Sequence, residues 1–198
     1  MNADVALSVV MTAFSTIAAV FMTPWLTTKL AGSYVSIKAS DLIFSTCQVV
    51  LLPVLLGLAL NTFMPSACAS VSQFTPFASV GFVSLICGSI SASNAGQLVA
   101  VNGKRLLLAI ITLHASGFLL GYIFAKLLGA DEAKSRTISI ETGMQNSALA
   151  SVLAVHFPDP RLTSLPGCVS ATCHSLIGSF LAAFWRWRSV QKLKSQTR

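Results

Sequence analysis

The residues best suited to bind a ligand lie in one short stretch, "TISIETGMQNSALA", at residues 137–150. Its carboxylate, Glu141, is followed by Gly143 and then by Gln145 and Asn146. Glycine weakens a helix, and a helix that breaks there frees carbonyl groups on one half and N–H groups on the other. Carbonyl and carboxylate oxygens suit a small cation, and the N–H end suits an anionic group. The sequence therefore predicts an ion-binding helix break around Gly143.

Glu141 is unusual because it stands inside an apolar run. The chain has only six acidic residues, and the other five open apolar runs or lie in polar loops. A charge at mid-membrane costs roughly 3 kcal/mol, so a glutamate inside an apolar span indicates a functional residue. The alternative is a protonated or snorkelling side chain that only packs helices.

A second polar cluster lies in the first apolar run. Ser8 and Thr12 are four residues apart and therefore share one helix face, which Ser15 and Thr16 continue. This face could supply hydroxyl ligands. Equally, serine and threonine in membrane helices often bond only the backbone or a neighbouring helix.

The elements that must position these residues are membrane helices. The chain has 198 residues, of which 54% are hydrophobic and 10% charged, against about 25% charged in soluble domains. A spanning helix needs roughly 20 mostly apolar residues, and backbone groups in lipid must be satisfied within it. We therefore predict one all-α transmembrane domain over 1–198, with a turn at 64–76. Its six spans lie at about 5–27, 41–63, 75–94, 105–128, 135–157 and 163–186.

The net charge of +7 indicates membrane topology rather than nucleic-acid binding. Eight of the thirteen lysines and arginines fall on the side of the two termini, where they can meet anionic lipid head groups. Trp185 and Trp187 alternate with arginines at the end of the last apolar run, as in an interfacial anchor. We expect the polar tail, 189–198, to be disordered.

Two intramembrane histidines and a glycine pair are weaker signals. His114 and His174 each lie in an apolar span, where a neutral, hydrogen-bonded histidine is commoner than a cation or proton site. Gly117 and Gly121 form a small-xxx-small motif that predicts helix packing. An intramembrane enzyme that uses Glu141 with either histidine lacks a nucleophile or metal motif, so we predict no enzymatic activity.

Several stretches resemble the bile acid:sodium symporter family, especially its plant plastid branch. They include "SRTISIETGMQNSALA" (135–150) and "LHASGFLLGYIFAKLLG" (113–129). The resemblance implies an inverted-repeat transporter of ten helices, in which the six spans here match helices five to ten and the one with Glu141 is discontinuous around Gly143. It implies core-type helices at 5–27, 105–128, 135–157 and 163–186, and panel-type helices at 41–63 and 75–94.

The resemblance also implies binding residues. One sodium site would use Ser8, Thr12 and Glu141. A second would use Glu141, Thr142, Met144 and Gln145, with Thr142 and Met144 acting through backbone carbonyls. The substrate-facing residues would be Asn146, Ser147 and His174.

The function implied is sodium-coupled transport of a small organic anion by alternating access. Sodium would be the coupling ion, with no organic cofactor, and the membrane would be the plastid envelope in a plant or otherwise the plasma membrane. Nothing in the chain matches family helices one to four, so we expect both sodium sites to be incomplete within it. The implied partners are membrane lipid and either the missing N-terminal half or a full-length relative. The alternative is a truncated, non-transporting fragment that packs with or regulates such a relative.

Overall fold

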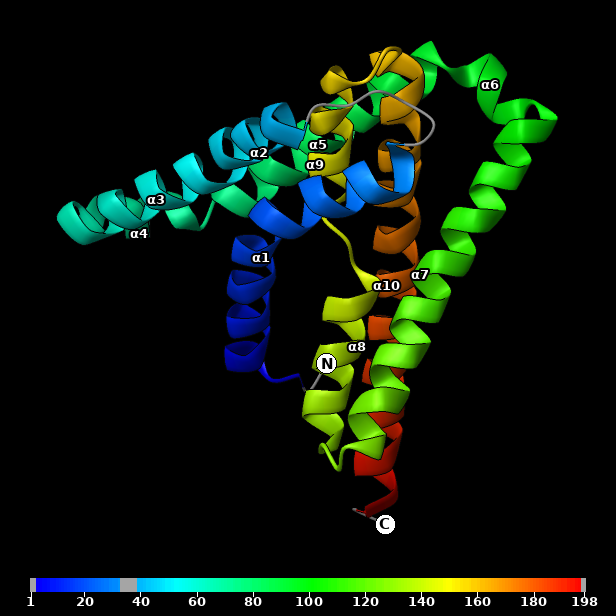
Figure 1. The fold of residues 1–198 in the computed structure, drawn as a ribbon. Helices are drawn as coiled ribbons and strands as arrows, with labels where there is room; N and C mark the ends of the chain where they lie inside the picture. Colours follow the sequence, from blue (N-terminus) through cyan, green and yellow to red (C-terminus); the bar gives the residue numbers. More distant parts are fainter. Residues whose placement is uncertain (1–2, 33–38, 197–198) are drawn as a thin grey trace. The chain divides into compact units, whose positions relative to one another are not determined.

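Every regular element in the described part of the chain is a helix (Figure 1). The computed structural model describes residues 3–32 and 39–196. The predicted all-α fold is confirmed. In chain order the elements are α1 Val5–Ala31, α2 Ala39–Thr46, the π-helical turn η1 Cys47–Leu51, α3 Leu52–Phe63, α4 Pro65–Ser72, α5 Thr75–Ser93, α6 Ala95–Val99, α7 Val101–Leu127, α8 Glu132–Gly143, α9 Ser147–Leu153, the 3₁₀ turn η2 Ala154–His156 and α10 Pro160–Gln196.

Five helical segments of the described residues are long and apolar enough to cross a membrane. They are Val5–Leu30, Ser40–Phe63, Thr75–Ser93, Asn102–Leu127 and Pro160–Gln191. The remaining predicted span, 135–157, is interrupted: α8 ends at Gly143 and α9 has only seven residues, whereas a continuous span needs roughly 20. The break expected around Gly143 is therefore present. A sixth crossing, made by α8 and α9 together, stays a prediction.

Prolines set two helix boundaries between residues 39 and 75. Pro53 lies in the first turn of α3, directly after η1, where its missing N–H is tolerated. Met64 leaves the helical conformation, with φ −135° and ψ 55°, and Pro65 then begins α4. The connection predicted as a turn at 64–76 thus contains a short helix.

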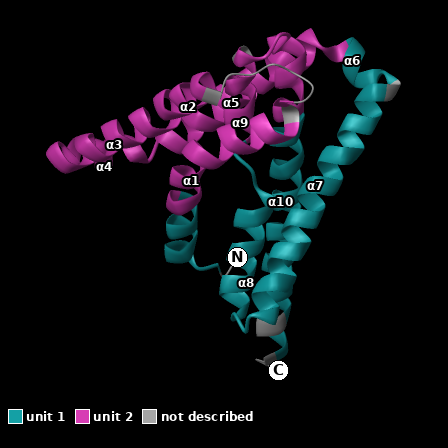
Figure 2. Ribbon diagram, viewed as in Figure 1, with its two compact units in different colours: residues 1–12, 96–146, 169–198 teal, residues 13–95, 147–168 magenta. Residues whose placement is uncertain are grey.

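The described residues form two compact units, which are coloured separately in Figure 2. The first unit comprises residues 1–12, 96–146 and 169–198, and therefore holds α7, α8, the start of α1 and the C-terminal part of α10. The second comprises residues 13–95 and 147–168, and holds α2 to α5, α9 and the start of α10. Nearly all the residues predicted to bind ligands lie in the first unit.

Within the first unit, α7 packs closely on α8 through its small residues. A Cβ atom on Gly121 would lie 2.9 Å from the Thr142 side chain, and one on Gly117 would lie 3.1 Å from the Thr142 carbonyl oxygen. Between them, the ring of Phe118 fills the space that a side chain at Gly143 would need. The helix contact predicted for Gly117 and Gly121 is therefore confirmed, and it falls beside the helix break.

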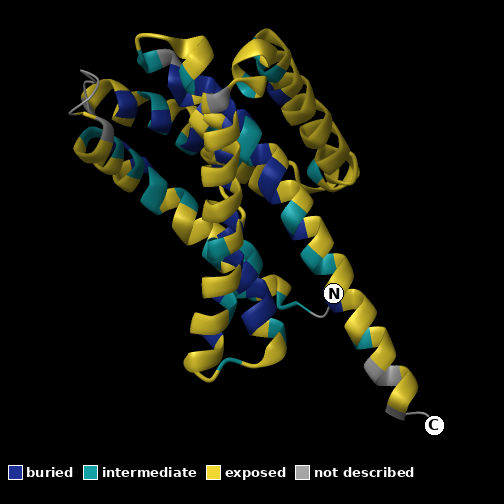
Figure 3. Ribbon diagram, turned by 90° about the vertical axis from the view of Figure 1, so that its right-hand side faces the viewer, coloured by how far each residue is buried: buried dark blue, intermediate teal, exposed yellow. Residues whose placement is uncertain are grey.

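Large apolar residues remain exposed along most of the helices, and Figure 3 colours the exposed residues of each helix yellow. Phe14, Phe77 and Phe180 are each more than three-quarters exposed. Such surface suits contact with lipid, because water-facing proteins rarely show apolar patches of this extent. The expectation of a disordered tail is wrong for residues 189–196, because α10 continues to Gln196 and the Ser189 hydroxyl donates to the Trp185 carbonyl at 2.9 Å.

Candidate functional site

The carboxylate of Glu141 faces two hydroxyl groups of α1. Ser8 donates a hydrogen bond to one carboxylate oxygen, and the Thr12 hydroxyl donates to the other at 2.9 Å. Glu141 and Ser8 are half-buried, while Thr12 is exposed. The structure thus brings together the three side chains expected to form one sodium site, and their binding of sodium stays a prediction.

Local contacts fix the start of α1 against α8. The backbone N–H of Asp4 donates to the Thr137 hydroxyl at 2.8 Å. The Asp4 carboxylate in turn accepts from the backbone N–H of Leu7 at 3.0 Å, which caps the first turn of α1. Because Ser8 and Thr12 follow on the next two turns, and Glu141 lies one turn beyond Thr137, these contacts set the register of the hydroxyls against the carboxylate.

Two side chains and one backbone N–H satisfy carbonyl groups at the end of α8. The Gly143 carbonyl oxygen lies 2.9 Å from Nδ1 of His114, and the Thr142 carbonyl accepts from the Gln145 side-chain amide at 2.9 Å. The Ile140 carbonyl accepts from the backbone N–H of Met144 at 2.9 Å. Three of the last four carbonyls of α8 therefore have defined partners, as a buried helix end requires.

The charge of Glu141 lies at the unfavourable end of its helix. The C-terminus of a helix carries roughly half a negative charge, and Glu141 is two residues before the last residue of α8. Two hydroxyl donors offset part of this negative potential. A small cation would offset more of it, so the geometry favours cation binding over a purely structural glutamate.

The other predicted ligands surround the break. Thr142, Met144, Gln145 and Asn146 are all exposed, and the last three have no helical assignment. Ser147 begins α9 in the second unit and is 5% exposed. The roles predicted for these residues in sodium or substrate binding stay predictions.

His174 lies beside His114 in the interior of the first unit. The two rings meet edge to face with centroids 5.2 Å apart, and His114 and His174 are 1% and 8% exposed. Since a carbonyl only accepts, Nδ1 of His114 carries the proton that it donates to Gly143, and Nε2 of a neutral ring then accepts from the Ser170 hydroxyl at 2.7 Å. The buried histidine expected at 114 is therefore found, with two partners.

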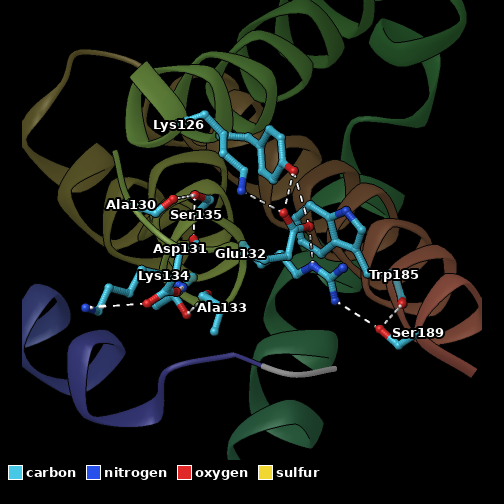
Figure 4. Close-up of polar contacts among 12 residues, drawn as sticks. Lys126, Ala130, Asp131, Glu132, Ala133, Lys134, Ser135, Trp185 and Ser189 are labelled. Atoms are coloured by element: carbon cyan, nitrogen blue, oxygen red, sulfur yellow. Dashed lines mark hydrogen bonds and ion pairs between the residues drawn. The ribbon is translucent and has the colours of Figure 1, made fainter. Parts of the chain in front are cut away.

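A charged network that the sequence reasoning missed lies at the start of α8 (Figure 4). The Glu132 carboxylate pairs with Lys126 at 2.9 Å and with Nε of Arg136 at 2.9 Å, and it accepts from the Tyr122 hydroxyl at 3.0 Å. The hydrogen bond from Lys126 is the largest cause that lowers the pKa of Glu132 to about 2, with further lowering by Arg136 and Tyr122. The four-residue spacing of Glu132 and Arg136 was the available signal.

Asp131 caps the same helix. Its side chain accepts from the backbone N–H of Lys134 at 2.8 Å, and this bond is the main cause that lowers the pKa of the Asp131 carboxyl. The loop acids that seemed unremarkable in the sequence thus anchor the end of α7 and the start of α8. They hold the helix that carries Glu141.

The comparisons with known proteins agree on one family. Residues 1–101 match the model of the sodium bile acid symporter family. The chain is 50% identical over 192 residues to the probable sodium/metabolite cotransporter BASS1, chloroplastic, of Arabidopsis thaliana, covering 96% of this chain and 47% of that protein. It is 43% identical over 188 residues to the probable sodium/metabolite cotransporter BASS2, chloroplastic, of Oryza sativa subsp. japonica, covering 94% and 44%.

The chain spans about half the length of these curated relatives. The relatives are chloroplastic by name, and five helices here have membrane-spanning length and composition, so the chain is an integral membrane protein of the plastid envelope. The family model covers half of the chain, and the identity to named family relatives extends over nearly all of it. The chain therefore belongs to the sodium bile acid symporter family.

Proposed function

We propose that the chain takes part in sodium-coupled transport of a small organic anion, with Glu141, Ser8 and Thr12 holding the coupling cation. The observation that carries this proposal is the Glu141 carboxylate at the negative end of α8, facing two hydroxyl groups of α1. The relatives are named sodium/metabolite cotransporters, which supports sodium as the ion.

A second cation position would use the carbonyl groups that follow Glu141. We propose the Thr142 and Met144 carbonyls and the Gln145 side chain as its ligands, together with Glu141. The Gln145 amide N–H₂ now bonds the Thr142 carbonyl. A cation there would replace that donor, and the Gln145 amide would turn to present its oxygen instead.

The substrate would meet the residues after the break. We propose that Asn146, Ser147 and His174 contribute to the anion site, and that α8 and α9 cross the membrane as one discontinuous element. In this scheme the six crossings correspond to helices five to ten of an inverted-repeat carrier. The core-type helices would move against the panel-type helices in alternating access. Asn146 is exposed directly after the break, which supports its proposed contact with the substrate.

Sodium binding can be tested without knowing the substrate. The thermal unfolding of the purified chain in neutral detergent is compared in sodium chloride and in choline chloride at equal ionic strength. Binding to the folded state alone raises stability by mass action, by about 2.7 kcal/mol at 100 times the Kd. We expect sodium to raise the Tm of the wild type and of the Asp159→Asn control, but not of Glu141→Gln. Equal unfolding of the wild type in the two salts would contradict the proposal.

Transport is tested in liposomes that contain the chain alone. If the chain alone suffices for transport, an inward sodium gradient drives uptake of a radiolabelled 2-oxoacid or, in a separate assay, of a radiolabelled bile acid, and Glu141→Gln abolishes it. Sodium binding without flux in a folded protein would instead favour the second candidate, a membrane fragment that packs with or regulates a longer relative. The observation behind that candidate is that the chain covers 47% of BASS1 of Arabidopsis thaliana.

A further inference from the structure

Two cavities of different chemistry meet on the first unit. An apolar groove of about 720 Å³ lies between α7 and α10, lined among others by Phe118, Leu119, Ile177, Phe180, Leu181 and Phe184. A polar pocket of about 830 Å³ is lined by Glu132, Arg136, Trp187 and Ser189. Tyr122 and Arg188 line both cavities. The two therefore form one continuous surface that is apolar at one end and charged at the other.

The groove has the length of one membrane leaflet. Ile177 and Arg188 mark its ends on α10, and 11 residues of helix rise about 16 Å at 1.5 Å per residue. The hydrocarbon core of a bilayer is about 30 Å thick, so one leaflet measures about 15 Å. Both groove helices have membrane-spanning composition, at Asn102–Leu127 and Pro160–Gln191. An acyl chain that begins near Arg188 would reach the far end of the groove near mid-membrane.

The walls of the groove suit an acyl chain. Phe118 is buried at 4% exposure and forms the floor, whereas Leu119 and Phe180 remain 59% and 76% exposed on the rim. A flexible hydrocarbon chain can follow such a shallow groove along its whole length. Within the bilayer the chain would be held by van der Waals packing against these walls, because the surrounding lipid tails are as apolar as the groove.

The polar pocket carries excess positive charge. Among the residues that line it, Arg136 and Arg188 are cationic and Glu132 is the one carboxylate, which leaves an excess of one positive charge. Lys126 and Arg136 pair with that carboxylate, and Arg136 also donates to the Ser189 hydroxyl at 3.1 Å, one of the contacts drawn in Figure 4. Arg188 takes part in none of the ion pairs found among the described residues. Its guanidinium therefore offers charge to a bound anion.

We propose that this surface binds an anionic membrane lipid, with the head group against Arg188 and Arg136 and one acyl chain in the groove between α7 and α10. Basic pockets between membrane helices at the interface recognise anionic head groups in this way. Trp187 lines the same pocket, and tryptophan favours the depth of the head groups. The site is distinct from Glu141 and does not depend on sodium coupling.

The test measures lipid retention by the full chain. Native mass spectrometry in neutral detergent compares phosphatidylglycerol with phosphatidylcholine of identical acyl chains. We expect preferential retention of phosphatidylglycerol, reduced about fivefold by Arg188→Gln, the loss expected for one basic residue at a membrane surface. Arg186→Gln, on the same helix but outside the lining of both cavities, is the matched control and should retain the lipid.

A second pair of variants tests the acyl chain. Ile177→Trp fills the end of the groove and should reduce retention of both lipids, whereas Leu176→Trp, one residue earlier and exposed, should not. Equal retention of the two lipids by the wild type overturns the proposal. So does displacement of the lipid by millimolar glycerol phosphate, which would indicate a site for a free anion. A dimer that Ile177→Trp dissociates would assign the groove to a second copy of the chain.

Discussion

The imidazole of His114 binds the carbonyl oxygen of Gly143 across 29 positions of sequence, at a distance of 2.9 Å. Gly143 is the last residue of α8, so the histidine takes the place of the backbone N–H that a continuing helix would provide. The Ser170 hydroxyl holds the opposite ring nitrogen at 2.7 Å. His114 thus fixes the end of the half-helix that presents Glu141.

Replacing His114 by phenylalanine should loosen this helix end. An aromatic ring is kept, but the buried Gly143 carbonyl loses its donor, which costs about 1–3 kcal/mol. We expect a lower Tm and faster hydrogen exchange at the Met144 amide, whose bond to Ile140 closes the last turn. Ser170→Ala leaves the bond from His114 to the Gly143 carbonyl in place and should change exchange at the Met144 amide less. A His114→Phe protein with wild-type exchange at Met144 would show that the contact does not hold the helix end.

The two hydroxyls facing Glu141 should matter for sodium more than for folding. In Ser8→Ala and Thr12→Val the carboxylate loses a partner that supports it, and such losses weaken metal binding by roughly tenfold or more. The measurement is the sodium concentration needed for half of the maximal rise in Tm. Ser116→Ala and Thr112→Val are matched controls, because their exposed hydroxyls bond only carbonyls of α7 among the contacts found. Equal sodium titrations for the site and control variants would remove both residues from the cation site.

The glycine at position 121 should tolerate no larger side chain. A Cβ atom there would lie 2.9 Å from the Thr142 side chain and 3.1 Å from the Ile138 carbonyl oxygen. We expect Gly121→Val to lower the free energy of unfolding by about 1–3 kcal/mol through overpacking. Gly88 of α5 has nothing within 4 Å of the same position, so Gly88→Ala should be neutral or raise stability by about 0.5–1 kcal/mol. Both are measured by unfolding in mixed micelles, and equal values for the two variants would contradict the close packing of α7 on α8.

Much of the helical architecture follows from one local property, the spacing of charges along an apolar chain. The stretch after Asp4 predicted α1, and the stretch after Arg161 predicted the apolar part of α10. The break after Gly143 also has a local cause, because glycine weakens a helix beside the polar pair Gln145 and Asn146. Each of these outcomes depends on residues that are near neighbours in sequence.

Contacts between distant residues were harder to predict. The pairing of His114 with Gly143 depends on the packing of α7 against α8, which periodicity does not specify. The pairing of Glu141 with Ser8 and Thr12 was expected only from the family resemblance, since hydroxyls on a membrane helix usually bond their own backbone. The ordered helix beyond Ser189 was missed because its polar residues gave no apolar signal. There the Ser189 hydroxyl accepts a hydrogen bond from Arg136 at 3.1 Å, a contact across 53 positions.

The stability of the charged network around Glu132 should depend on pH in the acid range. Its carboxyl has a pKa of about 2 in the folded chain, lowered from 4.5 chiefly by the hydrogen bond from Lys126. A depressed pKa adds stability above the unfolded value, and this contribution is lost as pH falls from about 4.5 towards 2. We expect Glu132→Gln to have a lower Tm than the wild type at pH 7 and the same difference at pH 6.

The difference between the two proteins should then shrink as the pH falls below 4.5. There the Glu132 carboxylate of the unfolded wild-type chain becomes protonated, whereas that of the folded chain stays ionised until the pH nears 2. Because Glu132 is 46% exposed, solvent and salt screen its ion pairs, so the difference at pH 7 should also decrease in about 1 M salt. Thermal unfolding in nonionic detergent at several pH values measures both effects. A Tm difference that stays constant from pH 7 to pH 2.5 would show that the variant acts through packing, and that the ion pairs with Lys126 and Arg136 do not stabilise the junction of α7 and α8.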